Sequence, residues 1–350
     1  MPERVIREGT HPFRPRPRLS PLLRRPAVLL AAAILLALCI LASLFVGSSR
    51  IPADQVAHYL LHPDASNVSY NINVLRVERT IIGVLVGAAL AVSGAVMQAV
   101  TRNPLAEPGL LGVNAGASLG IVLGTAALGV LPVPGQLLLA AVGALVATAL
   151  VQVIGMIGGS TSSPVRLVLI GVAFSAFAGA VIRGVVLAMP NLFRTFIDWE
   201  VGSLTRADIP LLPMTLLVAL GTGAALLLAG ALDNIALGDD VAAALGTRVG
   251  LVRGLSLVVI TLLCATATTV AGPIGFVGLM APLTASWLMG PHRGWIVALC
   301  ALGGPVVVLA ADVLGRVLAR PGEMQVGLLT AFVGSPVLLL MVLRMKDRAS

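Results

Sequence analysis

Ten long runs of apolar residues, separated by short polar stretches, dominate the pattern of this chain. Each run is close to the roughly 20 residues that an α-helix needs to cross the hydrocarbon core of a bilayer. Backbone groups in lipid must be hydrogen-bonded within their own segment, so we interpret each run as a helix. The pattern predicts an all-α polytopic membrane protein with about ten transmembrane helices. The runs are residues 27–46, 80–100, 109–131, 135–157, 167–189, 209–232, 254–271, 274–290, 294–312 and 325–343.

The stretch from Arg76 to Ala117 contains the most informative of these patterns. Gly83, Gly87 and Ala91 recur every four residues in the second run. One face of that helix is therefore nearly bare backbone, and a neighbouring helix can approach it closely. The run ends at residues 101–104, Thr-Arg-Asn-Pro, which predicts a turn at the membrane surface.

Two sets of four runs suggest an internal repeat. Runs two to five and runs seven to ten enter the membrane from opposite faces, and a Gly- and Pro-rich interruption follows the first run of each set. The interruptions are EPGLLGVNAGA (107–117) and AGPIGFVGLMAP (271–282). Interrupted segments at matching places in two inverted halves are typical of transporters. Because Gly and Pro are frequent in any membrane helix, a chance match is the alternative.

The composition and the charge distribution fit this interpretation. Of the 350 residues 58% are hydrophobic and 11% are charged, whereas soluble domains carry about 25% charged residues. Seven of the 23 basic residues lie in the first 25 positions, and such a bias holds segments on the cytoplasmic side. We therefore predict a disordered basic cytoplasmic tail at 1–26, one transmembrane domain at 27–345, and both termini in the cytoplasm. The net charge of +8 follows from this bias and does not indicate nucleic-acid binding.

Few residues suggest catalysis or metal binding. Cys39, Cys264 and Cys300 lie far apart within apolar runs, which favours small buried side chains over a metal site or a disulfide. The acidic residues fall in loops or near the ends of runs, which argues against a proton-coupled carrier and an intramembrane hydrolase. Lys346 is the only lysine, so no GxxxxGK[ST] phosphate loop exists and the chain does not bind ATP by that route. The energy for any transport is expected to come from another protein.

A polar segment on the cytoplasmic side, residues 233–253, contains LGDDVAAALGTRVG. Asp239 and Asp240 precede a short apolar run, where negative charge favours a helix N-terminus, and Gly246 is placed to end the helix. A short rigid helix here could transmit force from a soluble partner. An ordinary capped loop helix is the alternative.

Seven stretches in order along the chain resemble the iron-siderophore and vitamin B12 permease family of ABC importers. Among its members the chain is most similar to the ferric-catecholate (enterobactin-type) permease subunits. The stretches cover nearly everything from residue 76 onward. They are GAALAVSGAVMQAVTRNPLAEPGLLGVNAGAS (87–118), SSPVRLVLIGVA (162–173), WEVGSL (199–204), LGDDVAAALGTRV (237–249), VAGPIGFVGLMAP (270–282), ADVLGR (311–316) and VGLLTAFVGSPVLL (326–339).

The resemblance implies a permease subunit in the cytoplasmic (inner) membrane of a bacterium. It implies a second permease subunit, expected to be a paralogue, two ATPase subunits inside and a substrate-binding protein outside. The chain itself would be no enzyme and would hold no cofactor, since ATP and magnesium would bind to the ATPases. The cargo would be a ferric siderophore. Vitamin B12 or haem within the same family, an ion-coupled secondary carrier, and a structural or sensory membrane protein are the alternatives.

The family motifs also assign roles to particular residues. Arg76, Arg79 and Arg316 match external arginines that pair with acids of the binding protein; a snorkelling interfacial arginine is the alternative for each. The segment that matches the ATPase-coupling helices contributes Gly238, Asp239, Asp240, Ala242, Ala243, Leu245 and Gly246. The loop that matches the inner gate contributes Gly159, Ser160, Thr161, Ser162 and Ser163.

The translocation path has weaker candidates. Gln98, Asn114 and Arg183 are polar residues within the predicted spans. Gln98 is interpreted either as an interhelix hydrogen bond or as a path residue, and Arg183 either snorkels outward or attracts an anionic chelate. The chain departs from the family at Pro282–Ser286, where the usual His and Arg are missing, so a contact with the ATPase could differ there.

Overall fold

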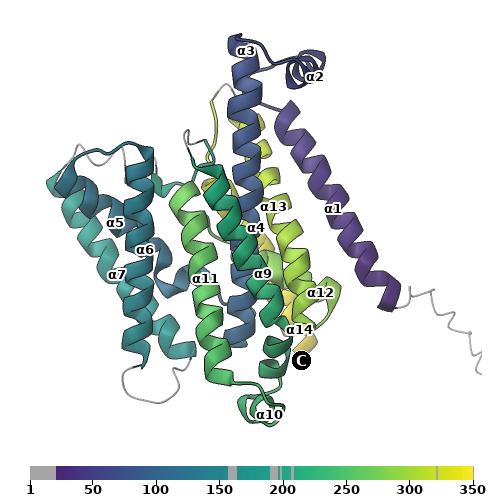
Figure 1. The fold of residues 1–350 in the computed structure, drawn as a ribbon, viewed down its shortest axis with the longest axis vertical. Helices are drawn as coiled ribbons and strands as arrows, with labels where there is room; N and C mark the ends of the chain where they lie inside the picture. The colour runs from purple at the N-terminus through teal and green to yellow at the C-terminus, as the bar shows by residue number, and fades with distance from the viewer. Residues whose placement is uncertain are drawn as a thin grey trace, which may run out of the picture.

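The computed structural model describes residues 21–156, 164–189, 196–197, 199–205, 209–320 and 322–349. Every regular element that is assigned bounds in these ranges is helical (Figure 1). The long elements are α1 (Pro21–Phe45), α4 (Val77–Thr101), α5 (Val113–Leu128), α6 (Val133–Met156), α7 (Pro164–Ala188), α9 (Leu211–Ala236), α11 (Val249–Ala271), α12 (Val277–Met289), α13 (Arg293–Leu318) and α14 (Val326–Ala349). The short ones are α2 (Ala53–Leu61), α3 (Asn67–Tyr70), a π-helix η1 (Asn71–Arg76), a 3₁₀ turn η2 (Pro108–Leu111) and α10 (Asp239–Ala244).

One helix coincides with each of the ten predicted runs, so the all-helical fold is confirmed. Seven helical stretches in the described residues are long and apolar enough to cross a membrane. α5, α12 and the apolar part of α14 (Val326–Leu340) are shorter. The count of ten spans therefore stays a prediction. At the N-terminus α1 begins at Pro21, so residues 21–26 are helical where we expected disordered tail, and residues 1–20 lie outside the described ranges.

α4 lies at the centre of the bundle (Figure 1). It packs against α9, α11, α12 and α13, and 19 of its 25 residues are buried. A helix that is buried on all sides carries apolar or small residues around its whole circumference. In α4 the charged residues accordingly lie in the first two turns, at Glu78 and Arg79.

The glycine face predicted on α4 is a close helix–helix contact with α13. A Cβ atom on Gly87 would lie 2.5 Å from the backbone N of Pro305, and one on Gly304 would lie 2.1 Å from the carbonyl O of Gly87. Farther along α4, a Cβ atom on Gly94 would lie 1.8 Å from the carbonyl O of Gly278 in α12. The absence of side chains at these positions is what allows the backbones to approach.

The two predicted interruptions meet inside the protein. Arg102 (φ 51°) reverses the chain after α4, and the segment that follows returns toward α12 before α5 begins. Its Glu107 Oε1 accepts a hydrogen bond from the backbone N–H of Phe276, the residue that precedes α12, at 3.1 Å. α5 and α12 begin three to four residues later than predicted, because Gly112 (φ 81°) and Phe276 (φ 69°) have left-handed backbone conformations that delay both helices.

The packing of the two sets of helices is reciprocal. The first helix of the first set, α4, contacts α12 and α13 of the second set, and the first helix of the second set, α11, contacts α5 and α6. Within each set the second helix packs on the third, as α5 on α6 and α12 on α13. This is the arrangement that an inverted repeat predicts.

Gly94→Ala tests the close contact between α4 and α12. The added methyl group has no room beside Gly278, so we expect a loss of about 1–3 kcal/mol of stability. The measurement is the apparent melting temperature of the full-length chain in detergent. Gly223→Ala in α9 is the matched control, because nothing lies within 4 Å of a Cβ atom built there. Equal melting temperatures for the two variants would contradict the contact.

Candidate functional site

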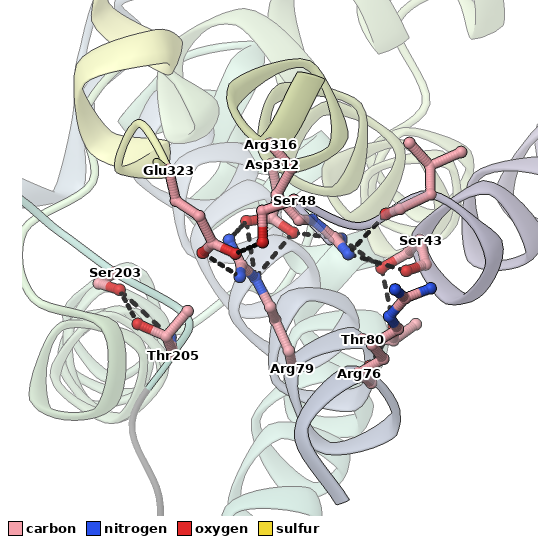
Figure 2. Close-up of polar contacts among 11 residues, drawn as sticks. Ser43, Ser48, Arg76, Arg79, Thr80, Ser203, Thr205, Asp312, Arg316 and Glu323 are labelled. Atoms are coloured by element: carbon pink, nitrogen blue, oxygen red, sulfur yellow. Dashed lines mark hydrogen bonds and ion pairs between the residues drawn. The ribbon is translucent and has the colours of Figure 1, made fainter. Parts of the chain in front are cut away.

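A buried carboxylate between two arginines links α4 to α13 near the end of the bundle that carries α2 and α3 (Figure 2). Arg79 donates to Asp312 Oδ1 from Nε at 3.0 Å and from Nη2 at 2.7 Å. Arg316, one turn after Asp312, donates from Nη2 to Oδ2 at 2.6 Å. Asp312 is fully buried and Arg316 is 1% exposed. Charges that are removed from water in this way need close partners, and each member supplies a partner for the others.

Glu323 lies at the outer rim of this ion cluster and adds a second carboxylate. Its Oε2 accepts from Arg79 Nη1 at 2.6 Å, and its Oε1 accepts from Ser48 Oγ at 2.7 Å (Figure 2). Burial by itself would raise the pKa of Glu323, but the hydrogen bonds from Ser48 and Arg79 and the positive charge of Arg79 outweigh it, so the pKa is lowered. Glu323 is therefore ionised at neutral pH, and with Asp312 it matches the charges of Arg79 and Arg316.

Arg316 and a third arginine, Arg76, hold the end of α1. The last carbonyl groups of a helix have no partner inside the helix, and cations are favoured there. Arg316 Nη1 donates to the carbonyls of Ser43 (2.8 Å) and Val46 (3.0 Å), and Arg76 Nη1 donates to that of Leu44 (2.9 Å). α1 carries no basic residue in its own last turn. The cations come instead from helices that lie far away in the sequence.

A cavity of about 210 Å³ opens beside this cluster. Its lining includes Arg76, Arg79, Arg316, Glu78, Glu323 and Ser49. Arg76 is the last residue of the π-helix η1, whose wider turn leads directly into α4. Arg76 donates to backbone carbonyls and to Ser49, and it forms no ion pair with any acid in the described part of the chain. It is the one arginine of the three without a carboxylate partner there.

The three arginines predicted to dock a binding protein are thus brought together, but they are not three exposed charges. Arg76, Arg79 and Arg316 are 4%, 9% and 1% exposed. Arg79 and Arg316 are neutralised within the chain by Asp312 and Glu323. Sequence reasoning missed these two acids as partners of the arginines. The spacing of Asp312 and Arg316, four residues apart in one helix, is the signal that could have revealed one pair.

At the opposite end of the bundle, α10 is the short helix predicted between α9 and α11 (Figure 1). Gly238 (φ 117°) and Gly246 (φ 83°) flank it, and Asp239 and Asp240 occupy its first turn as expected. Asp239 forms ion pairs with Arg102 at the end of α4 and with Arg253 in α11, the latter at 3.0 Å. α10 is therefore tied to two of the long helices.

The outer face of α10 is apolar. Leu237, Val241 and Leu245, spaced four residues apart, are 64%, 47% and 58% exposed. Ala243 and Gly246 are exposed with them, whereas Ala242 is fully buried. Ala242 therefore packs against the bundle and is not available to a partner, which corrects its assignment to the coupling surface. Leu237 and Val241 were missed, although their four-residue spacing could have indicated this stripe.

The path candidates have separate surroundings. Gln98 is buried and donates from Nε2 to the carbonyl of Leu279 at 3.1 Å, so the structure favours the interhelix hydrogen bond over a path role. Asn114 Oδ1 accepts from Thr268 Oγ1 at 2.8 Å and joins α5 to α11. Arg183 is exposed on α7. The structure does not gather these three residues into one site.

Two acids that were expected at loops or span ends form hydrogen bonds within the chain. Glu107 lies between the two interrupted segments and bonds to Phe276, as described above. Glu200 Oε2 accepts from Ser118 Oγ in α5 at 3.2 Å, and burial raises the pKa of Glu200. Glu107 lies in a loop, as expected, but after the turn at Arg102 this loop folds back against the bundle and packs beside the start of α12.

The remaining predictions concern the cytoplasmic side. The inner-gate residues Gly159–Ser163 lie outside the described residues. In the segment that departs from the family pattern, Leu283 is buried and Ser286 donates back to the carbonyl of Leu283 at 2.8 Å. Within the described ranges no group of three or more His, Cys, Asp or Glu side chains could hold a metal ion.

Comparisons with known proteins agree over nearly the whole chain. The FecCD transport family matches residues 35–344. The ferric enterobactin transport system permease protein FepD of Escherichia coli is 43% identical over 303 residues, which is 86% of this chain and 90% of that protein. The vitamin B12 import system permease protein BtuC of Vibrio vulnificus is 33% identical and covers 83% of this chain and 89% of its own length. A solved inward-facing structure of a putative metal-chelate type ABC transporter is similar with a TM-score of 0.80 at 25% identity, covering 91% of this chain and 99% of that one.

Asp312→Asn tests whether the buried carboxylate holds the outer end together. The variant keeps the shape of the side chain but leaves the buried guanidinium of Arg316 without an ion-pair partner and that of Arg79 with Glu323 alone, so we expect a loss of about 3–5 kcal/mol of stability. The measurement is the apparent melting temperature of the purified full-length chain. Glu323→Gln is the matched control: its side chain is 34% exposed, and we expect a loss of about 1 kcal/mol or less. The interpretation fails if both variants melt at the same temperature.

Proposed function

This chain belongs to the FecCD transport family, and we propose that it is the membrane permease subunit of an ABC importer for a ferric siderophore. The observation that carries the proposal is the family match over residues 35–344 together with 43% identity to a ferric enterobactin permease. The chain is a multi-pass protein of the cytoplasmic membrane, with seven helical stretches in the described residues that are suited to crossing it. Its role is to provide the path, and it catalyses no reaction itself.

Two ATPase subunits would supply the energy. The chain has no phosphate loop of its own, because its single lysine is Lys346. ATP and magnesium would bind to the partner subunits. The exposed apolar stripe of α10, Leu237, Val241 and Leu245, supports this proposal, because a partner would remove it from water at the cytoplasmic surface.

The ion pairs of Asp239 would carry force from α10 into the membrane. If α10 moves with an ATPase subunit, it must be bound to the helices whose positions it changes. Arg102 follows α4 and Arg253 lies in the first turns of α11, so both ties end on central helices of the bundle. We propose coupling through this contact, with the loop Gly159–Ser163 as the inner gate that the family resemblance implies.

A substrate-binding protein would dock at the opposite end. The structure supports a refined docking role in which Arg76, not Arg79 or Arg316, receives an acidic side chain of the partner. Arg76 lines the outer cavity and lacks a carboxylate partner in the described part of the chain, whereas Arg79 and Arg316 already have Asp312 and Glu323. An acid that enters the cavity would therefore pair with Arg76 at the smallest cost to the existing ion cluster.

The cargo and the second permease subunit are the two parts of the proposal that rest on similarity. The cargo is assigned as a ferric siderophore because the chain is more similar to the ferric enterobactin permease than to the vitamin B12 permease. Vitamin B12 and haem are the alternative cargoes, and competitive binding of the three ligands to the partner binding protein distinguishes them. A second permease subunit, a paralogue of this chain, would complete the path.

An ion-coupled secondary carrier is the competing function. One observation favours it: Glu107 is a half-buried acid between two interrupted segments, which is a position that such carriers use. Uptake that continues without the ATPase but stops with an uncoupler would favour the carrier. Uptake that requires the ATPase supports the importer, and a reconstituted complex that accumulates no substrate would favour a structural or sensory protein.

Arg76→Glu tests the docking proposal. Charge reversal places like charges against the incoming acid, and we expect the affinity of the binding protein to fall by about 2–5 kcal/mol. The measurement is binding of the substrate-loaded binding protein to the assembled transporter in lipid discs. Arg76→Lys keeps the charge, so much of the affinity should remain.

Arg50→Glu is the matched control for this experiment. Arg50 is an exposed arginine just beyond the loop residues that line the cavity. We expect its reversal to change docking little. Equal losses for Arg50→Glu and Arg76→Glu would show only a diffuse charge effect and would overturn the specific role of Arg76.

Asp239→Asn tests coupling through α10. The two ion pairs are half-exposed and each contributes about 0.2–1 kcal/mol, so the fold should persist. We expect the number of substrate molecules imported per ATP hydrolysed in proteoliposomes to fall severalfold. Asp240→Asn is the control, because Asp240 is the neighbouring exposed acid and forms no ion pair in the described residues. An unchanged ratio for Asp239→Asn would exclude this route of coupling.

A further inference from the structure

A cavity of about 460 Å³ separates the cytoplasmic half of α1 from α12 and α13. Thr284 is the only polar residue among those that line it. The walls are otherwise aliphatic, and they include several small residues that leave the space open. Among the lining residues are Val28, Ala32, Leu35, Met280, Ala285 and Gly303.

The cavity lies where α1 diverges from the bundle. At its outer end Arg316 and Arg76 bind the carbonyls of Ser43 and Leu44. Toward its N-terminus α1 leans away from the bundle (Figure 1). Only 6% of the apolar window of α1 is buried inside the protein. The cavity therefore faces the hydrocarbon core of the membrane.

Positive charge lies at the cytoplasmic end of this space. Arg24 and Arg25 precede Val28, a lining residue, by four and three positions, so they share its face of α1 one turn closer to the cytoplasm. A Cβ atom on Gly290, at the end of α12, would lie 4.0 Å from Arg25 Nη2. His292 and Arg293 begin α13 at the same end.

This positive charge has few counter-charges. α1 and α12 contain no acidic residue, and Asp312, the only acid of α13, lies at the other end of that helix. Asp233 of α9 is the acid that faces this end in the described residues, and it is engaged by the backbone N–H of Arg293 and by His292. Among the described residues Arg24 and Arg25 therefore form no ion pair, and they lie at the mouth of the cavity.

We propose that this cavity binds one anionic phospholipid of the cytoplasmic leaflet. Its acyl chain lies between α1, α12 and α13, and its phosphate lies beside Arg24 and Arg25. Basic pockets between transmembrane helices on the cytoplasmic side are recognition sites for anionic headgroups, and the membrane surface there is itself negative. The buried acyl chain fills an apolar space, and the phosphate of the headgroup supplies a negative counter-charge to the arginines.

The test is lipid binding to the full-length chain, freed of native lipid in detergent and measured by native mass spectrometry. Phosphatidylglycerol and phosphatidylcholine with the same acyl chains are the two probes. We expect one phosphatidylglycerol to bind per chain in preference to phosphatidylcholine. Replacing both arginines, Arg24→Gln with Arg25→Gln, should lower phosphatidylglycerol binding by about fivefold for each charge removed. The same replacements should leave phosphatidylcholine binding unchanged.

Gly303→Leu tests the cavity itself. Gly303 lines the space and has no atom within 4 Å of a built Cβ, so a leucine fills the cavity without a clash. We expect this variant to lose the bound phosphatidylglycerol. Gly223→Leu is the matched control: it adds the same side chain at an open glycine of α9, away from the cavity, and should bind as the wild type does.

Three results would overturn the proposal. Equal binding of the two lipids to the wild type would exclude an anionic site, and an unaffected Gly303→Leu variant would place the lipid elsewhere. A wild-type dimer that Gly303→Leu dissolves would assign the cavity to an interface between two copies of the chain. None of these results bears on the cargo or on the ATPases, so they are distinguishable from a failure of the proposed function.

Discussion

The carboxylate of Asp312 holds together three parts of the chain that the sequence separates widely. It receives Arg79 from α4 and Arg316 from α13, and Arg316 in turn donates to the end of α1. Away from water, each of these charges would be costly alone, so the cluster forms as a unit or not at all. The position of α1 depends in part on it, because α1 has no basic residue in its own last turn and its end carbonyls accept from Arg316 and Arg76. The outer cavity and the apolar cavity beside α1 both depend on this arrangement.

α4 connects this cluster to the opposite face. It begins beside Arg79 and ends beside Arg102, which pairs with Asp239 of α10. Its glycine faces lie in backbone contact with α12 and α13, so it cannot move without them. The outer cavity and α10 therefore lie at the two ends of the same helix. Coupling between two ends of a protein needs such a contiguous element with alternative positions.

The interrupted segments introduce polarity into the centre of the bundle. Glu107 accepts a hydrogen bond from the backbone N–H of Phe276. Asn114 accepts one from Thr268 and so joins α5 to α11. Irregular backbone at membrane depth is tolerated where protein groups satisfy it. The carboxylate of Glu107 accepts from the backbone N–H of Phe276, which precedes α12. This acid therefore has a structural function: it caps the start of that helix.

The sequence by itself determined the helical class, the position of each long helix to within a few residues, the glycine face of α4 and the helical nature of α10. These features depend on local physics: an apolar run in lipid must close its own hydrogen bonds, and glycine spacing exposes one face of its own helix. The sequence also pointed to Arg76, Arg79 and Arg316, through motifs that resemble a family. It did not reveal that two of these arginines are neutralised by Asp312 and Glu323. Ion pairs between residues more than 200 positions apart, the contact of Glu107 with the start of α12 and the apolar cavity beside α1 all depend on how helices pack. Only the tertiary structure decided them, because no local pattern encodes a distance between distant segments.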